Sequence, residues 1–400
     1  MLIPRCFLFL CLLMVVTAIT AAQARAQLSF RPADPLNNSA FDHFYNMDYA
    51  RSISEFEQVL QKHPDDPFAV NHLLTAVLFQ ELYRMGVLNS GEYANDSFVA
   101  TAHRPADPKV QARIKELVEQ ARSLEEKRLA ANAKDVDALY ARGVTRGQLS
   151  TYTALVERSW YAALKSAVGA RNDHEQVLEL SPDYTDAKLI VGAHNYVLGS
   201  LPWGVKILVK VIGQGGNKDK GIRYLREAAA GSGETSTDAK IVLLLFLRRE
   251  HKYPEALEIA DALVPQYPQN LLIALEQGNL LRASGHNPEA ASAYQKILQS
   301  GRDGLYPDLH YELAALSLGD LLRAQKDYAG AVSAYEQVNQ IQKPDPEVLQ
   351  KANLGAGEMY DVLKKRELAI QKYQAVVATN VNTAPAETAR KRMKEAYRQE

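Results

Sequence analysis

A pattern that recurs every 34 residues is the strongest constraint on how this chain can fold. The tripeptide Pro-Glu-Ala occurs at residues 254–256 and again, in the same setting, at residues 288–290. Related segments begin at Asp48, Asp327 and Glu367. A unit of this length cannot bury its apolar face alone, so neighbouring units must stack to form one continuous core. The repeat therefore predicts an all-α solenoid built from helical hairpins.

Residues at fixed places in each unit resemble one repeat family. A glycine, a large apolar or aromatic residue, an alanine, a tyrosine and a β-branched residue recur in that order, and this pattern resembles the tetratricopeptide repeat. The resemblance implies two antiparallel helices per unit, with the glycine and alanine allowing close approach and the tyrosines filling the space between hairpins. The matching residues are Gly278, Leu281, Ala290, Tyr294 and Ile297, then Gly319, Leu322, Ala331, Tyr335 and Val338, then Gly357, Tyr360, Ala369, Tyr373 and Val376.

The repeats divide the chain into regions and predict about eight hairpins. The Pro- and Asn-rich residues after the signal predict a loose lead-in, and the regular repeats are densest in the second half of the chain. Thr383 has the character of an N-cap for a polar final helix, as a solenoid end requires. The predicted regions are a signal peptide (1–26), a lead-in (27–40), divergent hairpins (41–234) with a loop at 85–108 and an insertion at 200–216, regular units (235–382) and a capping helix (383–400).

The first residues have the composition of an export signal. An apolar run at residues 6–16 is followed by Ala24, Arg25 and Ala26, a small-x-small cleavage pattern. The run is shorter than the roughly 20 residues of a membrane span, so we predict cleavage after Ala26 and a periplasmic protein, with an uncleaved membrane anchor as the alternative. Because Cys6 and Cys11 are the only cysteines, the mature chain contains no disulfide and no thiol ligand.

Bulk composition and motifs argue against several function classes. The chain is 47% hydrophobic and 23% charged with a net charge of -1, which is typical of a soluble folded protein and gives no reason to expect nucleic acid as a partner. The glycines near Lys218 lack the spacing of a phosphate loop, and His174-Glu175 lacks the second histidine of a zinc protease motif. We predict no enzyme activity, no nucleotide, no metal and no cofactor, and leave the oligomeric state open.

The family resemblance implies a partner-binding groove along the first helices of the units. An arginine occupies the same place in three consecutive units, with acidic residues further on, so the groove would be electrically polar and suited to orienting a bound segment. The alternative is that these charges pair with neighbours such as Glu276. Four units place Ile241, Leu275, Leu316 and Leu354 at one inner position, which predicts an apolar floor. The predicted partner-binding residues are Arg248, Arg249, Asn279, Arg282, Asp320, Arg323, Glu358 and Asp361.

The insertion at residues 200–216 interrupts one hairpin with a Pro-Trp-Gly turn, an apolar segment and a glycine cluster. One interpretation packs the apolar segment onto the solenoid. The other gives it a peripheral contact with a membrane surface or a partner, with Trp203 as anchor and Lys206 and Lys210 on one side.

Together these features predict a non-enzymatic scaffold of the cell envelope that binds a peptide or a helix of a partner protein in a concave groove. The alternative is a helical carrier for an apolar small molecule or lipid, with a pocket formed by the 85–108 loop and the 200–216 insertion.

Overall fold

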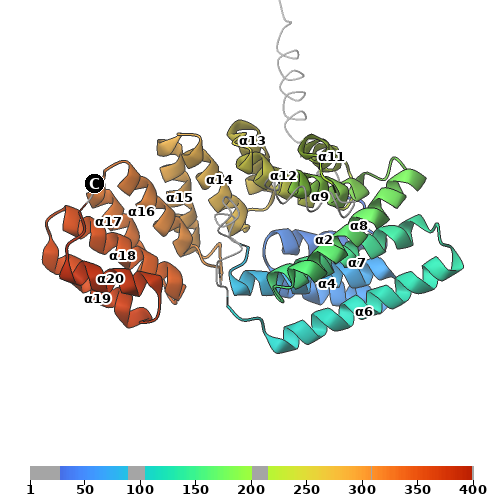
Figure 1. Cartoon of the computed structure of the whole chain (residues 1–400), viewed down its shortest axis with the longest axis horizontal. Coiled ribbons are helices and arrows are strands. Elements are labelled where there is room, and N and C mark those ends of the chain that lie inside the picture. The colour runs from blue at the N-terminus through green and yellow to red at the C-terminus, as the bar shows by residue number, and fades with distance from the viewer. Residues whose placement is uncertain (1–27, 89–103, 201–214, 308, 399–400) are drawn as a thin grey trace, which may run out of the picture.

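The computed structural model describes residues 28–88, 104–200, 215–307 and 309–398 of the chain (Figure 1). In these residues seventeen α-helices and one short 3-10 helix follow one another, and β-type pairing is limited to one bridge between Ser29 and Gly233. The predicted all-α fold is confirmed. The helices are α2 (Pro35–Tyr45), α3 (Tyr49–Lys62), α4 (Pro67–Met85), α6 (Pro108–Ala131), α7 (Val136–Leu155), α8 (Trp160–Leu180), η2 (Thr185–Ala187), α9 (Lys188–Ser200), α11 (Lys218–Ala230), α12 (Ser236–Arg249), α13 (Tyr253–Gln266), α14 (Leu271–Ala283), α15 (Asn287–Arg302), α16 (Glu312–Ala324), α17 (Tyr328–Val338), α18 (Pro346–Val362), α19 (Arg366–Thr379) and α20 (Ala384–Lys394).

Consecutive helices pack as hairpins that stack side by side. The pairs are α2 with α3, α4 with α6, α7 with α8, α9 with α11, α12 with α13, α14 with α15, α16 with α17, and α18 with α19. This gives eight hairpins within the described part of the chain, as the repeats predict. Helix α20 covers the last hairpin, where Ala386 and Ala389 pack against Tyr373 and Val376.

Glycine and tyrosine set the spacing of the regular hairpins. In three successive units the glycine of the first helix lies directly against the tyrosine ring of the second helix, so a larger residue there would overlap the ring. Tyr335 also reaches Gly355 of the next hairpin, and this ring fills the space between units as predicted. A Cβ atom would lie 2.6 Å from Tyr294 at Gly278, 2.4 Å from Tyr335 at Gly319 and 2.6 Å from Tyr373 at Gly357.

The final helix begins where the sequence predicts and ends earlier. The backbone N–H of Ala386 donates to the Thr383 hydroxyl at 3.2 Å, which confirms Thr383 as the N-cap. The helix stops at Lys394 rather than continuing toward residue 400. Its last carbonyl groups, those of Arg392 and Met393, accept hydrogen bonds from the Arg366 side chain. These bonds satisfy the helix end, and the chain then turns away in an extended conformation.

The expectation of a loose lead-in at residues 27–40 is wrong. Helix α2 already begins at Pro35, capped by Asp34, and Phe30 before it is buried in the core. Arg31 holds this segment in place, because its guanidinium lies over three aromatic rings and also forms an ion pair, an arrangement that stabilises a partly buried cation. The ring centroids lie 4.5 Å (Phe68), 5.4 Å (Tyr140) and 4.8 Å (Tyr184) from the guanidinium carbon, and the ion pair with Asp137 measures 2.6 Å.

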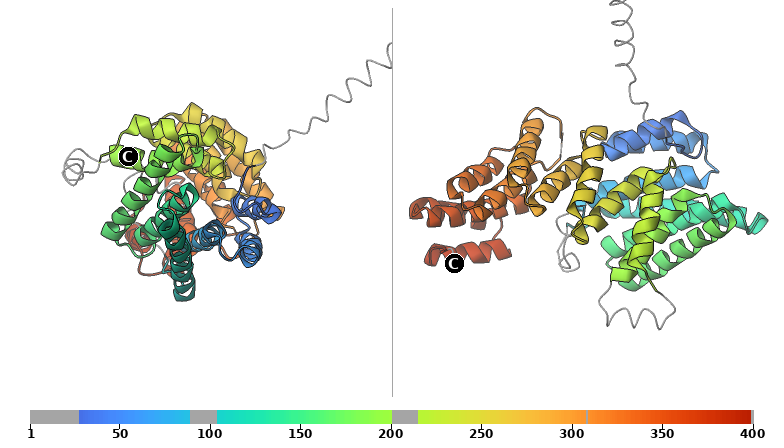
Figure 2. Two further views of the ribbon diagram at one scale, coloured as in Figure 1. Left: turned by 90° about the vertical axis from the view of Figure 1, so that its right-hand side faces the viewer. Right: turned by 90° about the horizontal axis from the view of Figure 1, so that it is seen from above.

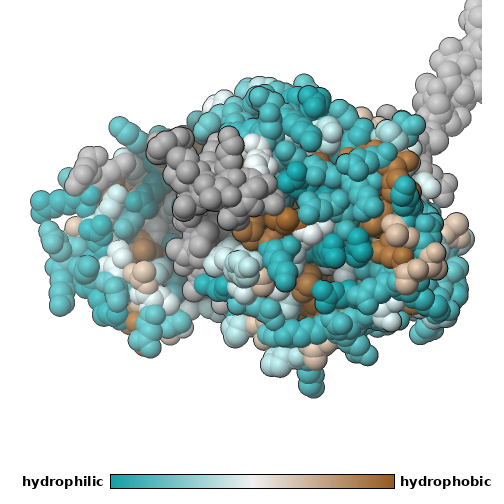
Figure 3. All heavy atoms as spheres, turned by 45° about the vertical axis from the view of Figure 1, so that its right-hand side comes forward, coloured by the Kyte–Doolittle hydropathy of each residue, from teal (hydrophilic) through white to brown (hydrophobic). Residues whose placement is uncertain are grey.

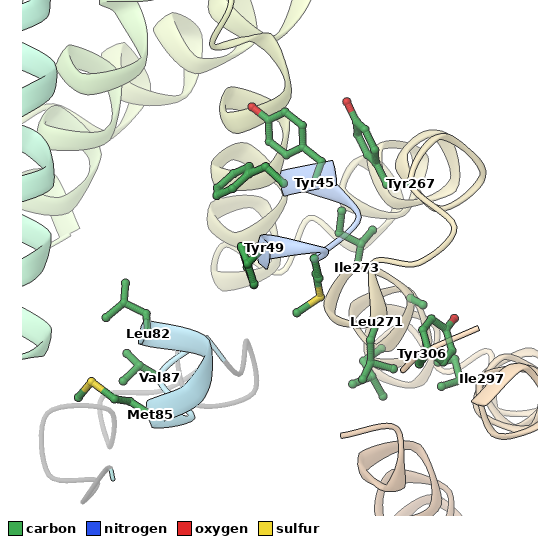
Figure 4. Close-up of a cluster of buried hydrophobic side chains, with 14 of the residues drawn as sticks. Tyr45, Tyr49, Leu82, Met85, Val87, Tyr267, Leu271, Ile273, Ile297 and Tyr306 are labelled. Atoms are coloured by element: carbon green, nitrogen blue, oxygen red, sulfur yellow. The ribbon is translucent and has the colours of Figure 1, made fainter. Parts of the chain in front are cut away.

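The first hairpin also packs against the middle of the solenoid. The helices curve round until α2 and α3 lie beside α13 and α14 (Figure 2). There the Asn270 amide donates to the carbonyl of Tyr45 at 2.6 Å, and the rings of Tyr45 and Tyr267 are 5.1 Å apart. Figure 4 shows Tyr45 and Tyr49 in the same cluster of buried side chains as Tyr267, Leu271 and Ile273. One apolar core therefore joins the two halves of the chain.

Several predicted features lie wholly or mainly outside the described residues. These are the signal peptide at 1–26, most of the 85–108 loop, and Trp203, Lys206 and Lys210 of the insertion. The helices that flank the insertion, α9 and α11, form a close hairpin, in which a Cβ on Gly221 would lie 2.7 Å from the carbonyl oxygen of Gly192. Among the residues that the structure describes, no helix is both long and apolar enough to cross a membrane.

Candidate binding groove

The first helices of the C-terminal hairpins form the inner face of the solenoid. Helix α16 packs directly against α14 on one side and α18 on the other, and these are the first helices of their hairpins. The second helices, α15, α17 and α19, do not approach one another as closely. In a stack of hairpins the layer whose helices lie closer together is the concave one. The concave face of this region is therefore lined by α14, α16 and α18.

A hollow of about 200 Å³ lies between α16 and α18 on this face. Three of the predicted binding residues, Asp320, Arg323 and Glu358, meet around it, and the predicted apolar floor residues Leu316 and Leu354 lie at its base. Sequence reasoning gave Tyr335 only a packing role and did not single out Lys351 or Gly355. The lining consists of Leu316, Asp320, Arg323, Tyr335, Lys351, Leu354, Gly355 and Glu358.

Ion pairs hold the charged wall of the hollow in place. The Arg323 guanidinium lies 2.8 Å from the Glu358 carboxylate, across the seam between α16 and α18. Burial alone would lower the pKa of Arg323, but the Glu358 charge raises it above its ordinary value, so Arg323 stays cationic. Asp320 accepts a hydrogen bond from the Tyr335 hydroxyl at 2.7 Å. Burial, together with the Asp320 charge, raises the pKa of Tyr335.

Asp361 is the best-buried acid near the groove, with 1% of its side chain exposed. Its carboxylate accepts hydrogen bonds from Arg366 at 2.9 Å and from the Tyr373 hydroxyl at 2.8 Å. It also accepts a bond from the backbone N–H of Tyr397, 2.8 Å away. A second hollow, of about 560 Å³, is lined partly by Asp361 and Tyr397 at the C-terminal ends of α16 and α18.

Arg248, Arg282 and Arg323, the arginines at the same place in three consecutive units, have different surroundings. Arg248 pairs with Glu276 of the next hairpin at 2.5 Å, with 16% and 3% of the two side chains exposed, so it is a nearly buried structural contact. Arg282 is exposed at the end of α14, and Arg323 is shared between Glu358 and the C-terminal segment. The structure therefore gives Arg248 the alternative role, pairing with a neighbour.

The remaining predicted residues lie nearby with different neighbours. Asn279 accepts a hydrogen bond from the Tyr294 hydroxyl at 2.8 Å, which repeats the Tyr335–Asp320 bond of the next unit. Arg249 is exposed at the end of α12. The repeated tyrosine bond shows that this groove position also supports packing, because it satisfies a buried hydroxyl.

Sequence reasoning missed four functional-site neighbours: Lys351, Arg366, Arg392 and Tyr397. Lys351 lies one turn before Leu354 on the inner face of α18, so the repeat register alone could have indicated it. Arg392 lies on the final helix, which the sequence predicts only as a polar cap, and its guanidinium lies 3.6 Å from Glu358. Nothing in the repeat pattern indicates Tyr397, because it lies beyond the last repeat.

Buried titratable groups also gather inside the N-terminal half. Glu234 lies 3.7 Å from His72, and burial raises the pKa of Asp238 to about 7. Burial alone would lower the pKa of Arg31, but the nearby Tyr184 and Glu234 raise it, so Glu234 of this cluster lies close to the segment that carries Arg31. Among the described residues, no three or more His, Cys, Asp or Glu side chains gather as metal ligands would.

Comparisons with known proteins find one family model and several distantly similar solved structures. A family model for the tetratricopeptide repeat matches residues 275–346. The structure of PilF from Pseudomonas aeruginosa is 15% identical, with 62% of this chain and 97% of that chain covered and a TM-score of 0.38. The human IFIT1 dimer with m7Gppp-AAAA is 14% identical, with 92% and 82% covered and a TM-score of 0.42. The type IV pilus biogenesis factor PilW is 13% identical, with 70% and 93% covered and a TM-score of 0.30.

No curated protein matches the sequence. The structural similarities are too distant to transfer a function, and what each of those proteins binds is a property of that protein. The repeat match at residues 275–346 begins in α14 and ends as α18 begins, and so lies on the hairpins that form much of the groove.

Proposed function

We propose that this tetratricopeptide repeat protein is a non-enzymatic scaffold that binds a peptide or a helix of a partner protein in the groove lined by α14, α16 and α18. The observation that carries this proposal is the hollow between α16 and α18, where charged side chains stand around the apolar Leu316 and Leu354. A groove with an apolar floor and a charged wall suits a segment that presents both kinds of side chain.

The electrostatics of the groove support an oriented partner. Exposed Arg282 lies at the α14 end, and the acidic Asp320, Glu358 and Asp361 lie toward α18. Arg323 and Arg366 partly compensate Glu358 and Asp361. Among the residues that the structure describes, Arg282 and Asp320 form no ion pair, so these two positions define the polarity that a bound segment meets. Such complementarity contributes more to orientation and association rate than to affinity.

The surface favours a protein partner over an apolar small molecule. Figure 3 shows a face that is predominantly hydrophilic, with apolar residues in separate places. Charged side chains, among them Lys326, Asp361 and Lys364, also line the larger hollow, whereas a lipid or drug-like ligand would require a mainly apolar cavity. The pocket of the carrier alternative would be built mainly from residues 89–103 and 201–214, outside the described residues.

The place where the scaffold acts follows from the sequence. The apolar run and the Ala24–Arg25–Ala26 pattern support export to the periplasm. Within the envelope, the insertion carrying Trp203, Lys206 and Lys210 is the part that we propose for any peripheral membrane contact.

The proposed function is tested by reversing charge inside the groove. A variant with Arg282→Glu and Lys351→Glu changes two exposed inner residues without opening the core. Immobilised wild-type and variant proteins are exposed to envelope extract, and the bound proteins are quantified by mass spectrometry. We expect the affinity for at least one partner to fall about tenfold, which corresponds to about 1.4 kcal/mol of binding free energy.

Lys296→Glu provides the matched control. Lys296 is exposed on α15, the outer helix of its hairpin, so this variant carries the same type of charge reversal away from the groove. The partner that the groove variant no longer binds should still bind this control. Its affinity for the wild type, the groove variant and the control is then measured with purified components. If the groove variant retains every partner of the wild type, the groove is not the binding surface.

A further inference from the structure

The segment that follows α20 folds back onto the groove. Glu395 is extended, with φ -132° and ψ 120°, and directs the next residues toward α16 and α18. Tyr397 is the residue that makes the contacts, and its side chain is partly buried. Through Tyr397 the segment reaches beyond the last hairpin, α18 and α19, and contacts Arg323 of α16 in the hairpin before it.

Tyr397 is held by both backbone and side-chain bonds. Its N–H donates to the Asp361 carboxylate at 2.8 Å, and its hydroxyl accepts from the Arg323 guanidinium at 3.0 Å. The guanidinium carbons of Arg323 and Arg392 lie 5.3 Å and 4.7 Å from the ring centroid. Cations near the face of an aromatic ring are attracted by its quadrupole. The site therefore recognises a backbone N–H, an aromatic ring and a phenolic oxygen together.

The receiving side chains are positioned independently of Tyr397. Arg366 and Tyr373 hold the Asp361 carboxylate, and Glu358 holds Arg323. Because these bonds fix the acceptor and the guanidinium in advance, a tyrosine-bearing segment would bind with little further ordering of the groove.

We propose that residues Glu395–Arg398 are an intramolecular ligand of the groove and that a partner segment binds there by presenting a tyrosine in the place of Tyr397. This inference rests on the proposed function, since it names the chemistry of the partner at the same surface. Lys326 and Lys364 line the hollow beside Tyr397. With the C-terminal segment displaced, these lysines face the residues next to the incoming tyrosine, and acidic residues suit them best.

Competition with the C-terminal segment sets the apparent affinity for a partner. A short flexible connection gives the tethered segment an effective concentration on the order of 1 mM. If an equivalent free peptide binds the open groove with a dissociation constant of about 0.1 mM, the tethered segment weakens its apparent affinity about tenfold. Removing Tyr397 from the full chain should therefore open the site.

The test uses a synthetic peptide of residues 394–400, KEAYRQE, as the probe. Its affinity is measured by NMR titration against the wild-type full chain and against Tyr397→Ala. We expect the variant to bind the peptide about tenfold more tightly than the wild type does. A peptide with alanine in place of tyrosine should not bind, and one with phenylalanine should bind more weakly because it cannot accept the Arg323 hydrogen bond.

Tyr161→Ala is the matched protein control, since Tyr161 is 83% exposed on α8 and far along the chain from the groove. This variant should bind the peptide like the wild type. Equal affinity of the wild type and Tyr397→Ala, equal binding of the tyrosine and alanine peptides, or no binding to the open variant at millimolar peptide would each overturn the proposal. Peptide binding together with an unchanged partner set for the groove charge variant would reject the scaffold function and retain the intramolecular ligand.

Discussion

Glu125 provides a quantitative test of how the N-terminal hairpins are packed. Its side chain is fully buried on α6, and only one of its carboxylate oxygens has a partner, the Thr145 hydroxyl. The nearest arginines, Arg142 and Arg146, are each bound to Asp173 at 2.6 Å. Burial therefore raises the pKa of Glu125 to about 7, against an ordinary value of 4.5 for the free side chain. Unfolding releases the carboxyl group into water, where it ionises readily.

The sign of the pH effect follows from this difference. Between the two pKa values the folded state holds a proton that the unfolded state has lost, so stability falls as the pH rises toward 7. Integrating a shift from 4.5 to about 7 gives a loss of about 2.5 kcal/mol between pH 5 and pH 8, at about 1.4 kcal/mol per unit of pKa. Glu125→Gln has nearly the same shape and no charge. We therefore expect it to be close to the wild type at pH 5 and more stable by about 2.5 kcal/mol or somewhat more at pH 8.

The measurement is urea unfolding of wild type and Glu125→Gln at pH 5 and pH 8. Comparing the two proteins at each pH removes the contributions that they share, including those of Asp238, whose pKa is also raised to about 7, and His174, whose pKa burial lowers to about 4. Glu126→Gln, at the exposed neighbouring position, is the control and should show no such gain. An advantage of Glu125→Gln that is the same at both pH values would refute the assignment of a protonated buried Glu125.

Three further changes test other parts of the fold. Gly319→Ala places a methyl group 2.4 Å from the Tyr335 ring and should lower the free energy of unfolding by about 1–3 kcal/mol, whereas Gly215→Ala, which meets nothing within 4 Å, should be nearly neutral in the same urea titration. Arg248→Ala removes the nearly buried 2.5 Å ion pair with Glu276 and should lower the free energy of unfolding by about 3 kcal/mol, while Arg282→Ala should change stability by less than about 0.5 kcal/mol; equal effects would contradict the assigned roles. Arg31→Lys should destabilise by about 1 kcal/mol because a lysine loses the planar stacking over the three rings, and an unchanged melting temperature would show that the N-terminal segment does not support the fold.

The repeat pattern was sufficient for the regular part of the fold because it encodes contacts between neighbours. Gly319 and Tyr335 lie 16 residues apart and belong to one hairpin, so their contact follows from the register alone. The same register placed Leu316 and Leu354 on the inner face. Thr383 was recognisable because an N-cap depends on only the first turn of its own helix. In each case the sequence signal and the contact are local or periodic.

The contacts that escaped prediction join segments with no periodic relationship. Arg31 reaches the ring of Tyr184, and Tyr45 reaches Asn270, across 225 positions in the second case. Such pairs depend on how far the solenoid has curved after many hairpins, and small rotations between neighbours accumulate along it. The ion pair between Arg248 and Glu276 was one of two alternatives that the sequence left open. Both residues were recognised, but the choice between a partner and a neighbour depends on burial, which periodicity does not provide.

The two ends of the chain restrict where a partner can bind. Residues 28–34 pack against the N-terminal half through the buried Phe30 and through Arg31, which lies over the rings of Phe68 and Tyr140. At the other end, residues 395–398 lie against α16 and α18 through Tyr397. The first segment is followed directly by α2, whose packing against the core holds it in place, so its release would disturb the fold. The second follows the end of α20 and can leave the groove without unfolding any helix. Of these two segments, the C-terminal one can therefore exchange with a partner at lower cost, and this difference supports the groove lined by α14, α16 and α18 as the binding surface that we propose.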